Sequence, residues 1–180
     1  DFMQMNEAAD DLIGRIEVAF WSVRWPAPHE LVAHDPADGP HTFKHLEEPS
    51  ILSHFGGKRR NEFEMELNSG RIEELYSMSK LAVHYYLPCF LKRLLSDRDD
   101  FGFIIEMISL LNKKRFDENG YSDFWPEFTT EQRQVILETV EFVLQHIKSY
   151  HLGEFEPQYR TSLQEARHQW RESSFGTSDM

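Results

Sequence analysis

The feature that most constrains the fold is an apolar segment from Ser79 to Leu95. Its hydrophobic side chains lie nearly all round a helix rather than on one stripe: Leu81, Ala82, Val83, Tyr85, Tyr86, Leu87, Cys89, Phe90, Leu91, Leu94 and Leu95. A helix of this kind is buried on most sides, so we predict that it is the central helix. Pro88 lies inside it. Because the proline ring collides with the preceding turn and its nitrogen donates no hydrogen bond, we predict a bend or a break there.

Helical periodicity recurs along the rest of the chain, and no segment alternates at period two for long. The pattern predicts further helices over about 6–20, 50–55, 61–67, 101–111, 130–150 and 157–172. Residues 68–70 are expected to end the helix over 61–67. A capping box at Thr129–Gln132 is expected to begin the helix over 130–150. The last helix has only a thin apolar stripe and is expected to dock on the surface. The sequence therefore predicts an all-α, single-domain bundle of about six or seven helices over residues 1–180, frayed at 1–5 and 173–180.

The stretch from Trp25 to Pro49 is the least regular part of the chain. It holds five prolines, at positions 26, 28, 36, 40 and 49, which make a long element unfavourable. Its aromatic and aliphatic side chains can anchor it to a core. We therefore expect an ordered loop rich in proline and histidine after the first helix, with room for one short helix.

Charge and cysteine usage exclude several classes of protein. The 31 acidic residues outnumber the 19 basic ones and give a net charge of −12, which disfavours direct binding to nucleic acid or anionic lipid. The single cysteine, Cys89, excludes an internal disulfide framework and a thiolate zinc cluster, and its apolar neighbours favour a packing role. No run approaches the roughly 20 apolar residues of a membrane span.

The N-terminal residues, Asp1 to Asp11, lack the basic and apolar regions of a signal peptide. Met3 and Met5 are candidates for the natural start, which would leave Asp1 and Phe2 as non-native additions. Together with the lone thiol, the acidic N-terminus indicates a cytoplasmic protein.

Three histidines in the proline-rich loop are the only candidate metal ligands. His34, His41 and His45 lie near Asp35 and Asp38, and imidazole with carboxylate suits a divalent metal. The chain has no His-Glu-x-x-His motif and no partner cysteine, and an acidic loop also collects such residues by chance. A metal site is therefore the alternative interpretation, and no other cofactor is expected.

His84 is a candidate for acid–base chemistry on the apolar segment. A general base there would use Tyr85 or Glu106 as a neighbour, whereas a lone histidine on an apolar face usually belongs to the core and makes one hydrogen bond. We favour the core role for His84.

Clusters of carboxylates supply the candidate binding residues. A run of acids is usually a solvated face, but it also suits docking of a basic partner. The candidate contacts are Glu62, Glu66, Glu73, Glu74, Asp97, Asp99 and Asp100, with Trp125 as an exposed aromatic anchor.

The box Tyr85-Tyr86-Leu87-Pro88 resembles one in an uncharacterised bacterial family of small helical domains. The Ala-Phe pair and prolines of residues 19–28 are similar to the opening of that family, and residues 128–132 resemble its later Phe-Thr-x-Glu-Gln helix start. Family members carry His-x-Cys-x-x-Cys after the first helix, but here residues 34–38 contain no cysteine. The resemblance implies a helical bacterial domain and no catalytic residues.

These observations favour a non-catalytic protein that binds another protein. The sharpest version is a bacterial immunity protein that neutralises a toxin by occluding its basic active site. One alternative is a small metal-dependent enzyme that uses His34, His41 and His45. Another is a helical scaffold with a small-molecule pocket lined by Tyr85, Tyr86 and Phe90.

Overall fold

The computed structural model describes residues 2–32, 44–62, 67–114 and 124–175. Over these residues the chain forms α1 (Phe2–Phe20), α2 (Lys44–Phe55), α3 (Ser69–Leu75), α4 (Lys80–Ser96), α5 (Phe101–Leu111), α7 (Thr130–Gln145) and α8 (Glu156–Phe175). Short 3₁₀ helices are η1 (Pro28–Glu30), η2 (Arg60–Glu62), η4 (Ile147–Tyr150) and η5 (Gly153–Phe155). The described ranges contain no strand, only an isolated bridge between Val32 and Met78. The prediction of an all-α, single-domain bundle is confirmed.

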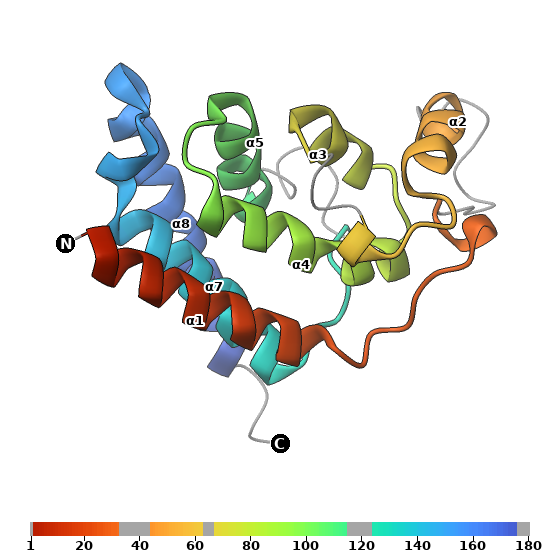
Figure 1. The fold of residues 1–180 in the computed structure, drawn as a ribbon, viewed down its shortest axis with the longest axis horizontal. Helices are drawn as coiled ribbons and strands as arrows, with labels where there is room; N and C mark the ends of the chain where they lie inside the picture. The colour runs from red at the N-terminus through yellow and green to blue at the C-terminus, as the bar shows by residue number, and fades with distance from the viewer. Residues whose placement is uncertain (1, 33–43, 63–66, 115–123, 176–180) are drawn as a thin grey trace.

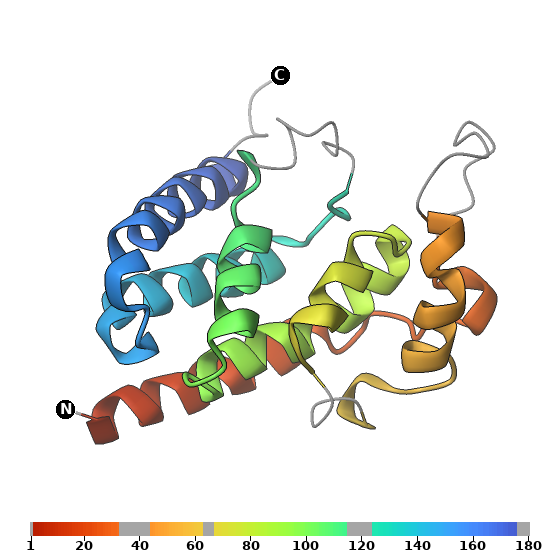
Figure 2. The same cartoon turned by 90° about the horizontal axis from the view of Figure 1, so that it is seen from above.

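The central position predicted for the apolar segment is also confirmed. α4 packs against α1, α7, α5 and α3, and its side chains are buried almost all round. Figure 1 shows α1 along the lower edge, with α2, α3 and α5 on the other side of α4. The second view, in Figure 2, shows α8 running alongside α7, and α8 also contacts α5.

The prediction for Pro88 was a bend or a break. α4 runs without interruption through Pro88, so the break is wrong, and the bend stays a prediction. Proline removes one hydrogen bond, but most of the stability of a helix in a protein comes from tertiary packing, and Pro88 is buried on α4. Side chains also donate to carbonyl groups in the turn before it. Arg60 Nη1 donates to Tyr85 O at 3.4 Å and Cys89 Sγ donates to Tyr86 O at 2.7 Å.

Helical structure extends into both ends that were predicted to fray. α1 begins at Phe2 rather than near Asn6, because Met5 continues the buried stripe of this helix. α8 ends at Phe175, and residues 176–180 lie outside the described residues.

Two boundaries in the first half of the chain differ from the prediction. α2 begins at Lys44 and contains Pro49, so helix replaces the last part of the predicted loop. Residues 68–70 begin a helix rather than end one, since Asn68 Oδ1 accepts a hydrogen bond from Arg71 N at 3.2 Å and caps α3. Of the helix predicted over 61–67, residues 61, 62 and 67 are described; the first two belong to η2, and Leu67 lies in no helix.

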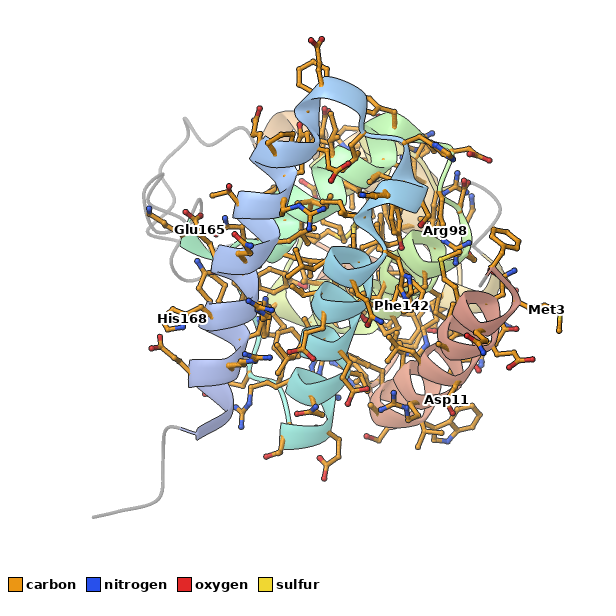
Figure 3. The ribbon with its side chains drawn as sticks, turned by 90° about the vertical axis from the view of Figure 1, so that its left-hand side faces the viewer. Met3, Asp11, Arg98, Phe142, Glu165 and His168 are labelled. Carbon is orange, nitrogen blue, oxygen red and sulfur yellow. The ribbon has the colours of Figure 1, made fainter. Side chains whose placement is uncertain are left out.

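α8 docks on the bundle through the stripe that the sequence predicts, and many of its other residues are exposed. Leu163, Ala166 and Trp170 are fully buried against the rest of the bundle. The Trp170 indole N–H donates to the carbonyl oxygen of Leu111 at 2.9 Å, which satisfies one of the free carbonyl groups at the end of α5. The stripe of α8 thus packs along α7 and, through Trp170, over the end of α5, and His168 lies on the side of α8 that faces away from α7 (Figure 3).

Candidate functional site

Glu74 does not belong to the predicted acidic surface, because its side chain is buried between α2 and α3. Its Oε1 accepts hydrogen bonds from Ser50 Oγ at 2.8 Å and from His54 Nδ1 at 2.7 Å. The same oxygen lies 3.3 Å from Nη2 of Arg71. Glu74 therefore joins two helices and is not available to a partner.

The composition of this buried cluster suggests a catalytic triad, but its geometry does not. In a Ser-His-acid triad the serine and the carboxylate bind opposite nitrogens of the imidazole. Here Ser50 Oγ lies 3.3 Å from His54 Nδ1, the same nitrogen that binds Glu74. The imidazole therefore does not stand between the serine and the carboxylate, because Ser50 donates directly to Glu74. The cluster has a structural role.

The other predicted glutamates are divided between exposed and undescribed positions. Glu62 is exposed, and its Oε2 accepts a hydrogen bond from Arg59 N at 2.8 Å beside η2. Glu73 is exposed on α3. Glu66 lies outside the described residues. Among the described residues from 62 to 74, Glu62 and Glu73 are therefore the two predicted carboxylates that are exposed.

The acidic loop between α4 and α5 is held rigidly. Asp100 Oδ1 accepts a hydrogen bond from Phe103 N at 3.1 Å and caps α5. Arg93 Nη2 lies 3.0 Å from Asp97 Oδ2 and 3.3 Å from Asp100 Oδ2. Asp99 is exposed and forms no ion pair with a described residue. This loop therefore presents one uncompensated carboxylate, on a fixed backbone.

Two exposed aromatic rings lie beside this loop. Phe101 begins α5 and Phe155 ends η5, their ring centroids are 6.0 Å apart, and they are 40% and 46% exposed. Asp99 and Glu154, both exposed, are close to these rings in the sequence. We call Asp97, Asp99, Phe101, Glu154 and Phe155 the aromatic–acidic patch. Paired exposed rings with carboxylates around them are typical of a protein-binding surface.

Sequence reasoning found the aspartates of the patch but not Phe101, Glu154 or Phe155. Phe155 lies in a 3₁₀ turn without periodicity, and only the packing of the chain brings it to Phe101. The sequence signal that was available is a large apolar residue between two glutamates, Glu154 and Glu156, where no core stripe requires one.

The prediction that Trp125 is an exposed anchor is wrong. Its ring is part of an aromatic cluster, with centroids 5.1 Å from Phe124, 6.0 Å from Phe128 and 5.4 Å from Trp170. The cluster packs residues 124–128 against α8. Trp125 therefore contributes to folding rather than to a binding surface.

His84 has the single hydrogen bond expected of a core histidine. Its Nε2 lies 2.8 Å from Oε1 of Gln132, whose Nε2 donates to Ala19 O at 3.0 Å. Since the amide oxygen faces the imidazole, His84 Nε2 donates the hydrogen bond. The imidazole also packs edge-on against Phe20 and Phe128. His84 thereby connects α4 with α7 and, through Gln132, with α1.

The aromatic residues proposed to line a small-molecule pocket have packing partners. Tyr86 packs against the Phe55 ring, and its hydroxyl lies 2.6 Å from the carbonyl oxygen of Lys58. The Arg60 guanidinium lies over the Tyr85 ring, 5.0 Å from its centroid. Phe90 stacks on Phe103. The Tyr85–Pro88 box therefore fixes residues 55–60 to α4, and Cys89 next to it is buried.

The candidate metal ligands fall where the structure gives no side chains. His34 and His41 lie outside the described residues, and His45 lies in α2 with its side chain undescribed. Elsewhere in the described ranges, no group of three or more histidine, cysteine, aspartate or glutamate side chains could hold a metal ion. Nor does the described part of the chain contain a helix long and apolar enough to cross a membrane.

Comparison with protein families, with curated proteins and with solved structures found no match to this chain. The resemblance to a helical bacterial family stays a prediction from the residues of the Tyr85–Pro88 box and the segments around it. The functional proposal therefore depends on the surface itself.

Proposed function

We propose that this protein is a non-catalytic protein-binding protein whose binding surface includes the aromatic–acidic patch. The observation that carries the proposal is the exposed pair of Phe101 and Phe155 beside the unpaired carboxylate of Asp99. Large aromatic side chains provide most of the energy of protein interfaces, and a ring of polar groups around them excludes water from the contact. The patch offers both features on one small surface.

The charge of the chain indicates a basic partner. A net charge of −12 gives long-range attraction to a positively charged protein, and it raises the association rate more than it prolongs the complex. The carboxylates of Asp99 and Glu154 would then contact lysine or arginine side chains at the rim. An immunity protein that covers the basic active site of a toxin is the sharpest form of this proposal.

The support beneath the patch suits tight binding. Arg93 bridges Asp97 and Asp100, and its guanidinium also lies over the Phe103 ring, 5.1 Å from the centroid. Asp100 caps the helix that presents Phe101. Because the loop is already ordered in the free protein, little conformational entropy of the loop is lost when a partner binds.

The proposal is tested with the gene next to the one that encodes this protein. If that gene encodes a basic toxin, co-expression of this protein should restore growth. Replacing both patch aromatics, Phe101→Ala with Phe155→Ala, should abolish protection while circular dichroism shows a folded protein.

A matched control keeps both rings and changes charge elsewhere. Glu127→Lys with Glu172→Lys reverses two exposed carboxylates away from the patch and should still protect. Full protection by the aromatic double variant would contradict the assignment of the patch. A neighbouring gene without a basic toxic product would contradict the immunity form of the proposal.

A further inference from the structure

The outer face of α1 carries the most exposed large apolar side chains of the described residues. Val18 is 77% exposed and Trp21 is 82% exposed. Trp21 directly follows the helix, and its N–H donates to Val18 O at 3.3 Å, which continues the helical turn. Gly14 precedes Val18 by four residues and lies on the same exposed face. The three positions form one stripe turned away from the core.

Gly14 has no structural requirement within the chain. A glycine inside a helix destabilises it relative to alanine, so such a residue usually allows close packing or an unusual backbone angle. Gly14 is helical, and a Cβ atom added there would meet no atom within 4 Å. Gly14 therefore leaves open space on the outer face of α1, where the backbone of another molecule can approach.

The charges around this stripe are negative. Glu7 and Asp10 are exposed on the same face and form no ion pair with a described residue. Glu17 pairs with Lys92 at 2.9 Å but its side chain remains 57% exposed. The one arginine of α1, Arg15, is bound to Asp11 and Glu138. The acidic groups repel a second copy of this chain and anionic lipid, and they attract a basic occupant.

We propose that the outer face of α1, made by Gly14, Val18 and Trp21, docks an amphipathic helix rich in lysine and arginine from a partner protein. The apolar side of that helix lies over Val18 and Trp21, its backbone crosses α1 at Gly14, and its basic side chains reach Asp10 and Glu17. Helices bind helices in this mode through apolar anchors at helical spacing. The loop that carries Asp97 and Asp99 meets α1 at its N-terminal end, where Arg98 contacts Phe2 and Asn6, whereas Val18 and Trp21 lie at the opposite end of α1. This surface is therefore separate from the proposed binding patch.

The test uses the full ¹⁵N-labelled chain and a synthetic 18-residue amphipathic helix of leucine and lysine. A peptide with glutamate in place of every lysine is the matched control. Trp21→Phe assigns the Trp21 indole resonance among the four tryptophans. The lysine peptide should shift this indole signal and the Gly14 amide signal at saturating concentration, and the glutamate peptide should leave both unchanged.

Two variants separate this surface from the patch. Trp21→Ala removes the anchor and Gly14→Gln fills the open position, so each should weaken binding of the lysine peptide at least tenfold. Both changes are at exposed positions, and thermal melts should confirm that the variants fold. Phe155→Ala should leave the peptide affinity unchanged. This inference is overturned if the Trp21 indole does not shift or if Gly14→Gln binds as tightly as the natural chain, and neither result would affect the proposed role of the patch.

Discussion

Truncating Trp170 should nearly unfold this protein, although the residue lies on the last helix. Its side chain is fully buried, packs against the rings of Trp125 and Phe128, and donates a hydrogen bond to Leu111 O at 2.9 Å. Trp170→Ala removes the ring contacts and the hydrogen bond together. The end of α5 and residues 124–128 lose the group that connects them to α8.

The magnitude follows from two contributions. A buried tryptophan removes about 150–250 Å² from water, which is worth about 4–6 kcal/mol at 25 cal/mol per Å². Measured substitutions of large buried aromatics by alanine cost about 3–5 kcal/mol. The Leu111 carbonyl group, left without its donor, adds about 1–3 kcal/mol. We therefore expect Trp170→Ala to lower the free energy of unfolding by at least 4 kcal/mol, close to the whole stability of a marginal domain.

Urea denaturation followed by far-ultraviolet circular dichroism measures this loss. The matched control is Trp21→Ala, since Trp21 is 82% exposed and its truncation should change the free energy of unfolding by less than about 0.5 kcal/mol. Trp170→Phe should fall between the two, because it keeps most of the packing and loses the N–H donor. A loss below about 1 kcal/mol for Trp170→Ala, or equal losses at both tryptophans, would refute the burial of Trp170 between α8 and the end of α5.

Three further outcomes are expected. Tyr86→Phe should lower the free energy of unfolding by about 0.5–1.5 kcal/mol in urea denaturation, because the Lys58 carbonyl oxygen loses the Tyr86 donor at 2.6 Å but keeps the Trp25 indole N–H at 3.2 Å. Cys89→Ser should cost about 1 kcal/mol or more from a buried hydroxyl and leave partner binding unchanged in a calorimetric titration. Burial, with the nearby Arg98, lowers the pKa of His146, so NMR titration should place it below that of N-acetylhistidine. Because the unfolded chain then binds the proton first, the contribution of His146 to stability is present above about pH 6.5 and declines below it.

Local patterns predicted much of the fold. α5 has the predicted bounds, because both signals that define it are local: its apolar stripe and the cap at Asp100 lie within one short segment of the chain. The capping box of Thr129 and Gln132 likewise begins α7 as expected. The contact of Trp170 with the end of α5 was not predictable in this way, since α5 is a distant part of the chain. Pro88 also kept its helix because of packing that no local pattern contains.

The candidate site was predicted in part, for the same reason. The acidic loop of Asp97 to Asp100 is evident from the local run of aspartates in the sequence. Whether a carboxylate is exposed depends on tertiary neighbours, and Glu74 is buried because Ser50 and His54 of another helix bind it. Phe155 becomes part of the patch only through its contact with Phe101. The acidic composition thus indicated a basic partner, whereas the surface that would contact this partner could be identified only from the folded structure.

The most direct test of the proposed binding function is the association rate with the basic partner, measured by stopped flow across a salt series. Asp99→Lys with Glu154→Lys reverses two charges of the patch, which changes the net charge by four units, from −12 to −8. The control Glu127→Lys with Glu172→Lys has the same net charge.

The patch variant should associate about tenfold more slowly than the natural chain at low salt. The difference should shrink near physiological salt, where the screening length is about 8 Å. The control should retain most of the natural rate. Equal rates for the two double variants at every salt concentration would contradict the claim that this patch meets the partner.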